Sequence, residues 1–449
     1  MKRIFVAPAC LTVLVLAACS GETQLPEATG EGTVRAINAI RTSPSISFLI
    51  EERAIAAVDY KDASITTAYD DLEYTFNFEA RLAGDAEATR IASQFVDVVR
   101  DMSYTFLLTG DLATPTLTVW ESARTVFDSD ATNFQLQLAH TAATLGNYDV
   151  YFAPPGTAPA PGQAIGTLSF GEILPGTSFE AGDYVLTLTS ADDPGTILFE
   201  SNTLSPQAST ELLFSIFDPD ANDLWPVPVR GFNLTTGASF NVVDASITPA
   251  VRFYHANIDL GPIDIYVDDP LTTPLVDDQS FGGFTADLPM PANEVPLTFT
   301  AFDNMGSVIF DIDRTFAEGT LNHLYLVKNS SGVDVIVDHI PDRRSIETFA
   351  KVSFLNSAAL DTNIDVYVVA RDELIDETNP ILFSLPVALD PVTVTLVEGA
   401  FDVYVTRTTE KVALAGPVPL DVVLGDVVEM IIYETGDPVA VDVVEVPLP

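Results

Sequence analysis

The sequence repeats one short frame four times, and this repetition constrains the fold more than any other feature. A strand-like hexapeptide with Asn or His at its fifth position occurs at Val34–Ala39, Leu136–Thr141, Val251–Ala256 and Val352–Ser357. Nine residues after that Asn or His a second element begins, at Ser47, Asp149, Asp264 and Asp365. The frames start roughly 100 to 115 residues apart, which is the size of a domain rather than of a solenoid turn or a propeller blade. The sequence therefore predicts four tandem domains.

Within each repeat, apolar and polar residues alternate with a period of two, which is typical of half-buried β-strands. Examples are Tyr184–Leu188, Ile263–Val267 and Val392–Leu396. Only Glu87–Asp101 has a helix-like pattern, and Phe95–Val99 within it also fits a strand. We therefore expect an all-β protein of antiparallel, immunoglobulin-like β-sandwich domains. The alternative is a large propeller with two four-stranded blades per repeat, but no repeat contains a half-repeat. The predicted domains span residues 34–133, 134–248, 249–349 and 350–449.

These motifs resemble a tandem domain of unknown function found in bacterial envelope lipoproteins, with the pattern H-A-S-P-D-A-P followed by V-D-V-Y-V-D-G. The third repeat is the most similar, since it has Val251–Ala256 and then Ile263–Asp269 in the same order. The first repeat departs from the pattern, with Ser47 in place of Asp and no Tyr. The motif positions of the other repeats are His140, Asp149, Tyr151, His255, Asp264, Tyr266, Asn356, Asp365 and Tyr367. The resemblance implies a β-sandwich repeat and no established activity.

The N-terminus predicts export and lipid attachment. Lys2 and Arg3 precede the apolar run Ile4–Ala18, which has the length of a signal-peptide core and is too short to span a bilayer. The run ends in Leu16-Ala-Ala-Cys19, which resembles the bacterial lipobox. We expect a signal peptide at residues 1–18, acylation of Cys19 and a flexible tether over residues 19–33. Ser20 follows the cysteine in place of the Asp that retains lipoproteins in the inner membrane, so we expect an outer-membrane location.

Composition narrows the class of protein further. The only cysteines are Cys10 and Cys19, so no disulfide can form within the body of the chain, and stability must come from packing. Asp and Glu number 64 against 20 Lys and Arg, giving a formal charge of -44. Such a field repels a phosphate backbone, so the sequence excludes nucleic acid as a partner.

The repeated His or Asn and the Asp nine residues later have the residue types of a catalytic dyad. However, the first position alternates between His140, His255, Asn38 and Asn356, and Asn cannot act as a general base. We therefore expect these side chains to fix a loop through hydrogen bonds to the backbone.

One loop has the residue types of a calcium site. Asp218, Asp220 and Asn222 supply oxygen ligands at the first, third and fifth positions of an EF-hand pattern, but Asp223 stands where that pattern needs Gly. Because adjacent carboxylates arise by composition alone in so acidic a chain, the default is a solvated acidic rim without a metal or another cofactor.

The remaining features favour a non-catalytic protein. Trp120 and Trp225 are candidates for a glycan-binding platform, although packing in the core is the preferred interpretation. We expect a lipid-anchored envelope protein that acts as an interaction or binding module for an unidentified protein or glycan. The alternatives are a glycan hydrolase with paired carboxylates and a passive acidic spacer. A deep pocket with convergent polar groups would distinguish the enzyme from the others.

Overall fold

The computed structural model describes residues 27–267, 273–360, 362–435 and 440–447. The predicted signal peptide and Cys19 lie outside these residues. Every helix or strand among the described residues is a β-strand, and Glu87–Asp101 contains the strand β7 (Thr89–Asp97) rather than a helix. In the same residues no helix is long and apolar enough to cross a membrane. The fold is all-β, as the alternating patterns predict.

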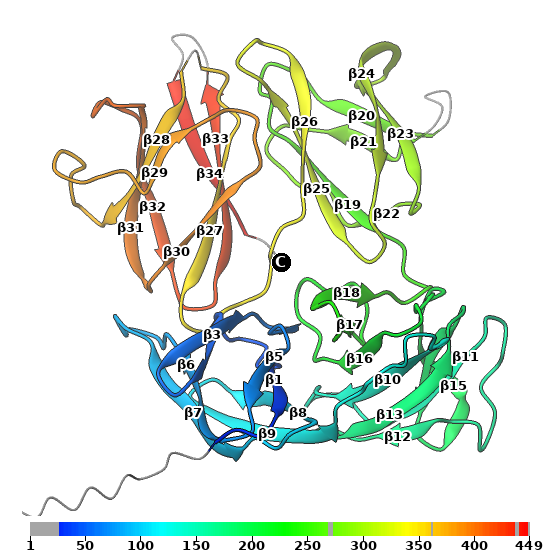
Figure 1. The fold of residues 1–449 in the computed structure, drawn as a ribbon. Helices are drawn as coiled ribbons and strands as arrows, with labels where there is room; N and C mark the ends of the chain where they lie inside the picture. The colour runs from blue at the N-terminus through cyan, green and yellow to red at the C-terminus, as the bar shows by residue number, and fades with distance from the viewer. Residues whose placement is uncertain (1–26, 268–272, 361, 436–439, 448–449) are drawn as a thin grey trace, which may run out of the picture.

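The strands form eight sheets in the described residues, and two successive sheets share each large hydrophobic cluster. We call each such pair of sheets a unit (Figure 1). The first unit contains β1 (Glu31–Asn38), β4 (Asp62–Ala63), β5 (Thr67–Asp70), β8 (Met102–Asp111) and β9 (Thr114–Ala123) in one sheet, and β2 (Ile46–Ile50), β3 (Arg53–Val58), β6 (Glu73–Ala80) and β7 in the other. The second contains β10 (Asn133–His140), β13 (Ile173–Glu180), β16 (Glu211–Ile216), β17 (Val229–Asn233) and β18 (Ala238–Val242), facing β11 (Tyr148–Ala153), β12 (Gly166–Leu168), β14 (Val185–Ser190) and β15 (Asp193–Glu200).

The third and fourth units repeat this plan. The third contains β19 (Ala250–His255), β22 (Leu288–Pro289), β25 (Leu321–Lys328) and β26 (Asp334–His339), facing β20 (Ile263–Val267), β21 (Val276–Gln279), β23 (Glu294–Ala301) and β24 (Asn304–Thr315). The fourth contains β27 (Ala350–Asn356), β30 (Val392–Leu396), β33 (Val427–Thr435) and β34 (Ala440–Pro447), facing β28 (Ile364–Ala370), β29 (Leu382–Leu385), β31 (Gly399–Arg407) and β32 (Ala413–Val422).

The sheets are not purely antiparallel, which corrects the expectation from the sequence. In each unit the first strand pairs in parallel with a strand that follows much later: β1 with β8, β10 with β16, β19 with β25 and β27 with β33. Between the two strands the chain passes through the opposite sheet, and such a long crossover is what parallel neighbours require. The first strand therefore lies at the centre of its sheet rather than at an edge.

The alternating residues of the strands build the cores. In β20, Ile263 and Ile265 point into the cluster of the third unit, together with Phe299 from β23. In the first unit the ring of Phe48 packs against Phe78 at a centroid distance of 5.0 Å. Burial of these side chains stabilises the units without any disulfide.

The units pack in pairs, through the outer face of the sheet that contains the first strand. Ile37 and Leu107 of the first unit contact Ala139 and Leu213 of the second in one buried cluster. An equivalent cluster joins the third and fourth units and contains Tyr254, Tyr325, Leu355 and Ile431. In all four units the residue immediately before the repeated Asn or His lies in such a cluster. We call units one and two the N-terminal half, and units three and four the C-terminal half.

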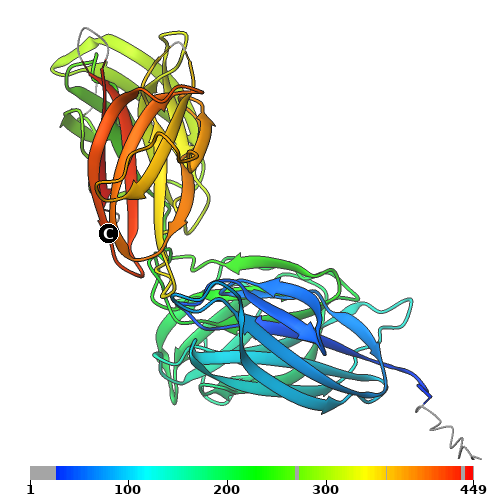
Figure 2. The ribbon, with the colours of Figure 1, turned by 90° about the vertical axis from the view of Figure 1, so that its left-hand side faces the viewer.

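Figures 1 and 2 show the arrangement of the two halves. Within each half the two units lie side by side, and Figure 2 shows the C-terminal half set at an angle to the N-terminal half. The chain passes from one half to the other between β18 and β19, and the segment between β26 and β27 returns to the boundary between the halves, where it contacts the first and second units.

We predict that each half is folded and soluble when it is produced alone. The first unit alone should associate through the outer face of its sheet. Residues 27–248 and 249–449, produced separately, should be soluble and rich in β-structure by circular dichroism, because each keeps its cluster between units. Residues 27–132 alone should associate, because Ile37 and Leu107, which are fully buried in the whole chain, become exposed. A monomeric first unit in analytical ultracentrifugation would contradict the pairing.

Candidate functional site

The repeated His side chains tie the loop that follows their strand. His140 is fully buried, its Nδ1 accepts a hydrogen bond from the backbone N–H of Ala142 (3.3 Å), and its Nε2 lies 2.8 Å from the carbonyl oxygen of Gly146. His255 makes the same two contacts, with Asn257 and Gly261. Burial lowers the pKa of both imidazoles, which favours the neutral form.

The repeated Asn side chains make equivalent bonds. The Oδ1 atom of Asn356 accepts from the backbone N–H of Ala358 (3.1 Å), and its Nδ2 donates to the carbonyl oxygen of Leu385 (3.0 Å). Asn38 bonds to Ile40 and Val58 in the same way. All four residues thus accept a hydrogen bond from the N–H two positions later, which an amide and a neutral imidazole do equally well.

Each repeated Asp side chain accepts hydrogen bonds from two other segments of the chain. Asp365 is 1% exposed, and its carboxylate oxygens accept hydrogen bonds from the N–H groups of Ser384 (2.8 Å) and Thr409 (3.1 Å). Both donor residues have positive φ angles, of 58° and 69°, which residues other than Gly rarely adopt. Asp264 accepts from Asp278 and Asp303, and Asp149 from Thr167 and Asp192.

The Tyr residues of the motif lie two positions further along the same strands. Tyr151, Tyr266 and Tyr367 are all buried. The ammonium group of Lys411 lies 4.5 Å from the ring centroid of Tyr367, within cation–π distance. The repeat motif therefore places His or Asn, Asp and Tyr in buried positions at strands and turns.

We predict that Asp365→Ala destabilises the chain by about 1 to 3 kcal/mol, because the N–H groups of Ser384 and Thr409 lose their acceptor. Asp365→Asn keeps one acceptor oxygen and should cost less. Chemical denaturation measures both effects, with Asp376→Ala in an exposed loop as the control. Equal stability of Asp365→Ala and the control would disprove the role of the carboxylate.

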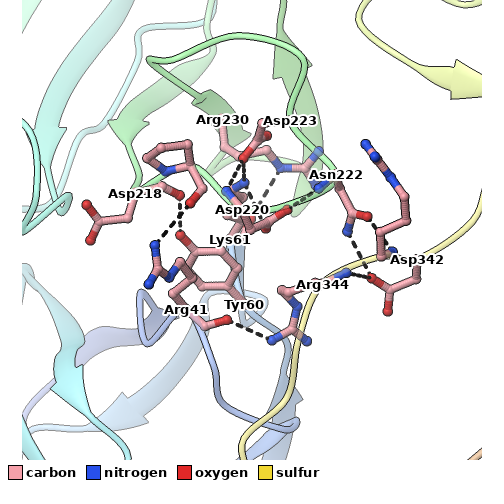
Figure 3. Close-up of polar contacts among 12 residues, drawn as sticks. Arg41, Tyr60, Lys61, Asp218, Asp220, Asn222, Asp223, Arg230, Asp342 and Arg344 are labelled. Carbon is pink, nitrogen blue, oxygen red and sulfur yellow. Dashed lines mark hydrogen bonds and ion pairs between the residues drawn. The ribbon is translucent and has the colours of Figure 1, made fainter. Parts of the chain in front are cut away.

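A cavity lies where the two halves meet, and Figure 3 shows polar contacts among residues that line it or lie beside it. It has a volume of about 640 Å³ and is lined by residues of the first three units and of the segment that leads to the fourth. Its charged lining residues are Asp59, Lys61, Asp220, Asp223, Arg230, Asp342, Arg343 and Arg344. We call it the junction cavity.

The predicted calcium loop forms one wall of this cavity. Asp218 accepts hydrogen bonds from the N–H groups of Ala143 (2.9 Å) and Thr144 (2.8 Å) in its own unit. Asp220 forms an ion pair with Lys61 of the first unit (3.0 Å). Lys61 also binds Asp223. Among the described residues no group of three or more His, Cys, Asp or Glu side chains has a metal-binding arrangement.

Asn222 of the same loop contacts the other half of the molecule. Its Nδ2 donates to the carboxylate of Asp342 (2.9 Å), and its Oδ1 accepts from the N–H of Arg343 (2.6 Å). Arg344 donates to the carbonyl oxygens of Arg41 (3.0 Å) and Ser43 (2.7 Å) in the first unit. The contacts shown between the halves are thus mostly polar, whereas inside each half an apolar cluster joins the two units in addition to polar contacts such as that of Lys61 with Asp220.

Trp225 lies in the core rather than on a surface platform. It is 5% exposed and belongs to the cluster of the second unit. On its other side it contacts Gly319 of the third unit, where an added Cβ would lie 2.3 Å from the indole ring. Trp120 is half-buried at the boundary between the first and second units, where its Nε1 donates to the carbonyl oxygen of Gly171 (3.3 Å).

A second polar cluster is buried between the third and fourth units. The hydroxyl of Tyr325 donates to Oε2 of Glu429 (2.9 Å) and lies 3.1 Å from Nδ1 of His323. Burial raises the pKa of Glu429 to about 7, and burial together with Arg252 and Arg343 lowers the pKa of His323 to about 3. Atoms Oε1 of Glu429, Nε2 of His323 and the hydroxyl of Tyr254 lack partners among the described residues.

We predict that this cluster makes stability depend on pH. An unfolded Glu has a pKa near 4.5, so with a folded value of about 7 the folded state binds the additional proton. The free energy of unfolding should therefore fall as the pH rises from 4.5 through 7, by up to roughly 3 kcal/mol. Urea denaturation at pH 5 and pH 8 should show a smaller difference for Glu429→Gln than for the unsubstituted chain. The exposed Glu410→Gln is the control, and equal pH dependence in all three would refute the assignment.

Sequence reasoning did not find Lys61, Arg343, Arg344 or Glu429. Their partners lie far away along the chain, for example 159 residues for Lys61 and Asp220. The available signal was the scarcity of cations in the acidic chain, because a few cations near Asp-rich loops are candidates for pairing.

The comparison with family models agrees with the motif resemblance. A family model for a domain of unknown function, DUF4397, matches residues 32–151. The match covers nearly all of the first unit and extends into the second through His140, Asp149 and Tyr151. Among solved structures, the Bacillus anthracis TIE protein matches at 9% identity, with 90% of this chain and 68% of that chain covered, at a TM-score of 0.15. No curated protein matches.

Proposed function

We propose that this chain is a non-catalytic, lipid-anchored protein of the bacterial cell envelope that acts as a binding module. The observation that carries the proposal is the junction cavity, because a cavity of about 640 Å³ is within the usual range of ligand sites. Side chains from distant parts of the chain converge on it, and they already bond to one another. A preformed, polar cavity of this kind suits binding of a ligand or partner.

The domain organisation is part of the proposal. Four tandem domains with the boundaries 34–133, 134–248, 249–349 and 350–449 are supported by the repeat frame and by the four large hydrophobic clusters. The immunoglobulin-like description is supported by two facing sheets per unit.

Arg343 is the lining residue that is most available to a ligand. Lys61 is engaged by Asp220 and Asp223, and Arg344 by carbonyl oxygens of the first unit. The guanidinium group of Arg343 has no hydrogen-bonding partner among the described residues. A carbonyl or carboxylate of a bound molecule would supply one.

The hydrolase alternative has weaker support. Glycoside cleavage needs two carboxyl groups that face one ligand. In the junction cavity, Asp220 and Asp223 bind Lys61, and Asp342 binds Lys351 (2.7 Å). Asp59 is the lining carboxylate without such a pair among the described residues. A passive spacer, in turn, has no need for a cavity built from distant segments.

The anchor is supported by the lipobox-like Leu16–Cys19 and by the polar segment that follows it. We predict that the chain labels with fatty acid in cells and fractionates with membranes, most of it with the outer membrane. Cys19→Ser should lose both the label and the membrane attachment, because its hydroxyl cannot replace the acylated thiol.

Two results would contradict the proposal as a whole. Membrane attachment of Cys19→Ser at the level of the unsubstituted protein would disprove the lipid anchor. Release of reducing sugars from envelope glycans by the purified chain, abolished in Asp59→Asn, would establish the hydrolase instead. Cys10→Ser, which changes the other cysteine, is the matched control for labelling.

A further inference from the structure

A second cleft lies between the first and second units, away from the junction cavity. It has a volume of about 440 Å³ and is formed by β9 of the first unit and by β10 and β13 of the second. Its lining residues are Thr105, Trp120, Glu121, Ser122, Ala123, Gln135, Gln137, Ile173, Leu174, Pro175 and Gly176. None of them lines the junction cavity.

One wall of the cleft carries a fixed, half-buried indole. Trp120 stands opposite Thr105 in the pairing of β8 with β9, and the hydrogen bond from its Nε1 to Gly171 of the second unit holds the ring at the boundary. Trp120 also lines the cleft. An aromatic ring held in this way offers an apolar surface at little cost in side-chain entropy.

The facing wall carries hydrogen-bonding groups with capacity to spare. Oε1 of Gln135 accepts a bond from the hydroxyl of Thr125, and its NH₂ group has no partner among the described residues. A Cβ at position 176 would lie 2.4 Å from Nε2 of Gln135, so Gly176 makes room for this amide. On the wall of Trp120, Ser122 adds a hydroxyl without a partner in the described part of the chain, because side chains two positions apart on β9 lie on one face of the sheet.

Charged groups are buried in the same face of the sheet. Arg35 stands opposite Thr105 in the pairing of β1 with β8, in one row with Trp120, and is 2% exposed. Its Nε lacks a partner among the described residues. The Glu211 carboxylate accepts a bond from Nε2 of Gln137 (3.1 Å), and burial raises its pKa. The boundary between the first two units thus contains two groups of opposite charge that interact electrostatically.

The charge of the chain selects the class of ligand. With 64 acidic residues against 20 basic ones, a polyanion is repelled. A neutral sugar ring has one apolar face, which can stack on an indole, and a rim of hydroxyl groups that both donate and accept. An amide NH₂ and a hydroxyl beside the indole match that rim.

We infer that the cleft between the first and second units binds a neutral saccharide, which stacks on Trp120 and forms hydrogen bonds with Gln135 and Ser122. This inference does not rest on the junction cavity or on the lipid anchor. It assigns a glycan-binding role to Trp120 alone, because Trp225 is 5% exposed and packs in the cluster of the second unit.

The chain provides its own optical probe, because it has only two tryptophans. In Trp225→Phe, the remaining indole emission comes from Trp120. Titration with chitotetraose, cellotetraose and maltotetraose should produce a saturable change in emission with at least one of them, at a dissociation constant of about 1 mM or lower. Isothermal calorimetry on the unsubstituted chain repeats the measurement, in case Trp225→Phe disturbs the core.

Two variants locate the site. Trp120→Ala should weaken binding about tenfold or more, and Gly176→Ala should weaken it by displacing the Gln135 amide. Phe383→Ala, which removes an exposed aromatic ring from β29 of the fourth unit, is the matched control and should bind as the unsubstituted chain does. Circular dichroism and melting curves confirm that each variant is folded.

Three outcomes would overturn the inference. The first is that none of the three tetrasaccharides binds the unsubstituted chain. The second is that folded Trp120→Ala binds as tightly as the unsubstituted chain. The third is that Arg343→Ala loses binding while Trp120→Ala keeps it, which would move the saccharide to the junction cavity.

Discussion

The structure depends on burial of both faces of one sheet in every unit. The inner face of the sheet that contains the first strand packs in the unit's own core, and its outer face packs against the neighbouring unit. A sheet of this kind needs apolar residues at successive positions, as in Phe106–Leu108. Because the body of the chain has no cysteine, this packing supplies the stability that disulfides provide in many exported proteins. It also brings β9 of the first unit beside β10 and β13 of the second, and so forms the cleft around Trp120.

The all-β class and the two-sheet plan could be predicted because alternation is a local property of the sequence. Ile263–Val267 alternates, and the structure has a strand with those bounds. The parallel pairing of β1 with β8 could not be predicted, because it depends on which strand closes the sheet after some seventy residues. The pairing of units left a weak trace, namely apolar residues such as Ile37 and Leu355 on the face that a lone sandwich would expose to water. Arg35, buried in that same face, hides the trace in the first repeat.

For the candidate sites, the sequence indicated the residue types but not which residues contact one another. The Asp-rich loop at 218–223 stood out, but the sequence cannot show that Lys61 reaches Asp220 and Asp223. Likewise, the alternation of His140 with Asn356 indicated a hydrogen-bonding role, but the sequence did not show that Asp365 accepts hydrogen bonds from Ser384 in β29 and from Thr409 between β31 and β32. In a chain of net charge -44, the cations Lys61, Arg343 and Arg344 lie together where the halves meet. The contacts that Asn222 and Arg344 form between the halves are polar and adjust more readily than apolar ones, so the two halves are joined less firmly than the units inside each half, which share an apolar cluster.

The parallel pair of β1 and β8 has a mechanical consequence. The chain enters the first unit at Glu31, and the residues of β1 from Thr33 to Ile37 pair with Ser103 to Leu107 of β8 at the centre of the sheet. A pull on the N-terminal segment acts along β1, so it loads the hydrogen bonds to β8 together, in shear, rather than opening them one after another. In a molecule that is held by its N-terminus in flowing liquid, the drag force would thus act on the hydrogen bonds of β1, a strand inside its sheet. Under such force the lifetime of the attached protein is set by the rate of unfolding rather than by its equilibrium stability.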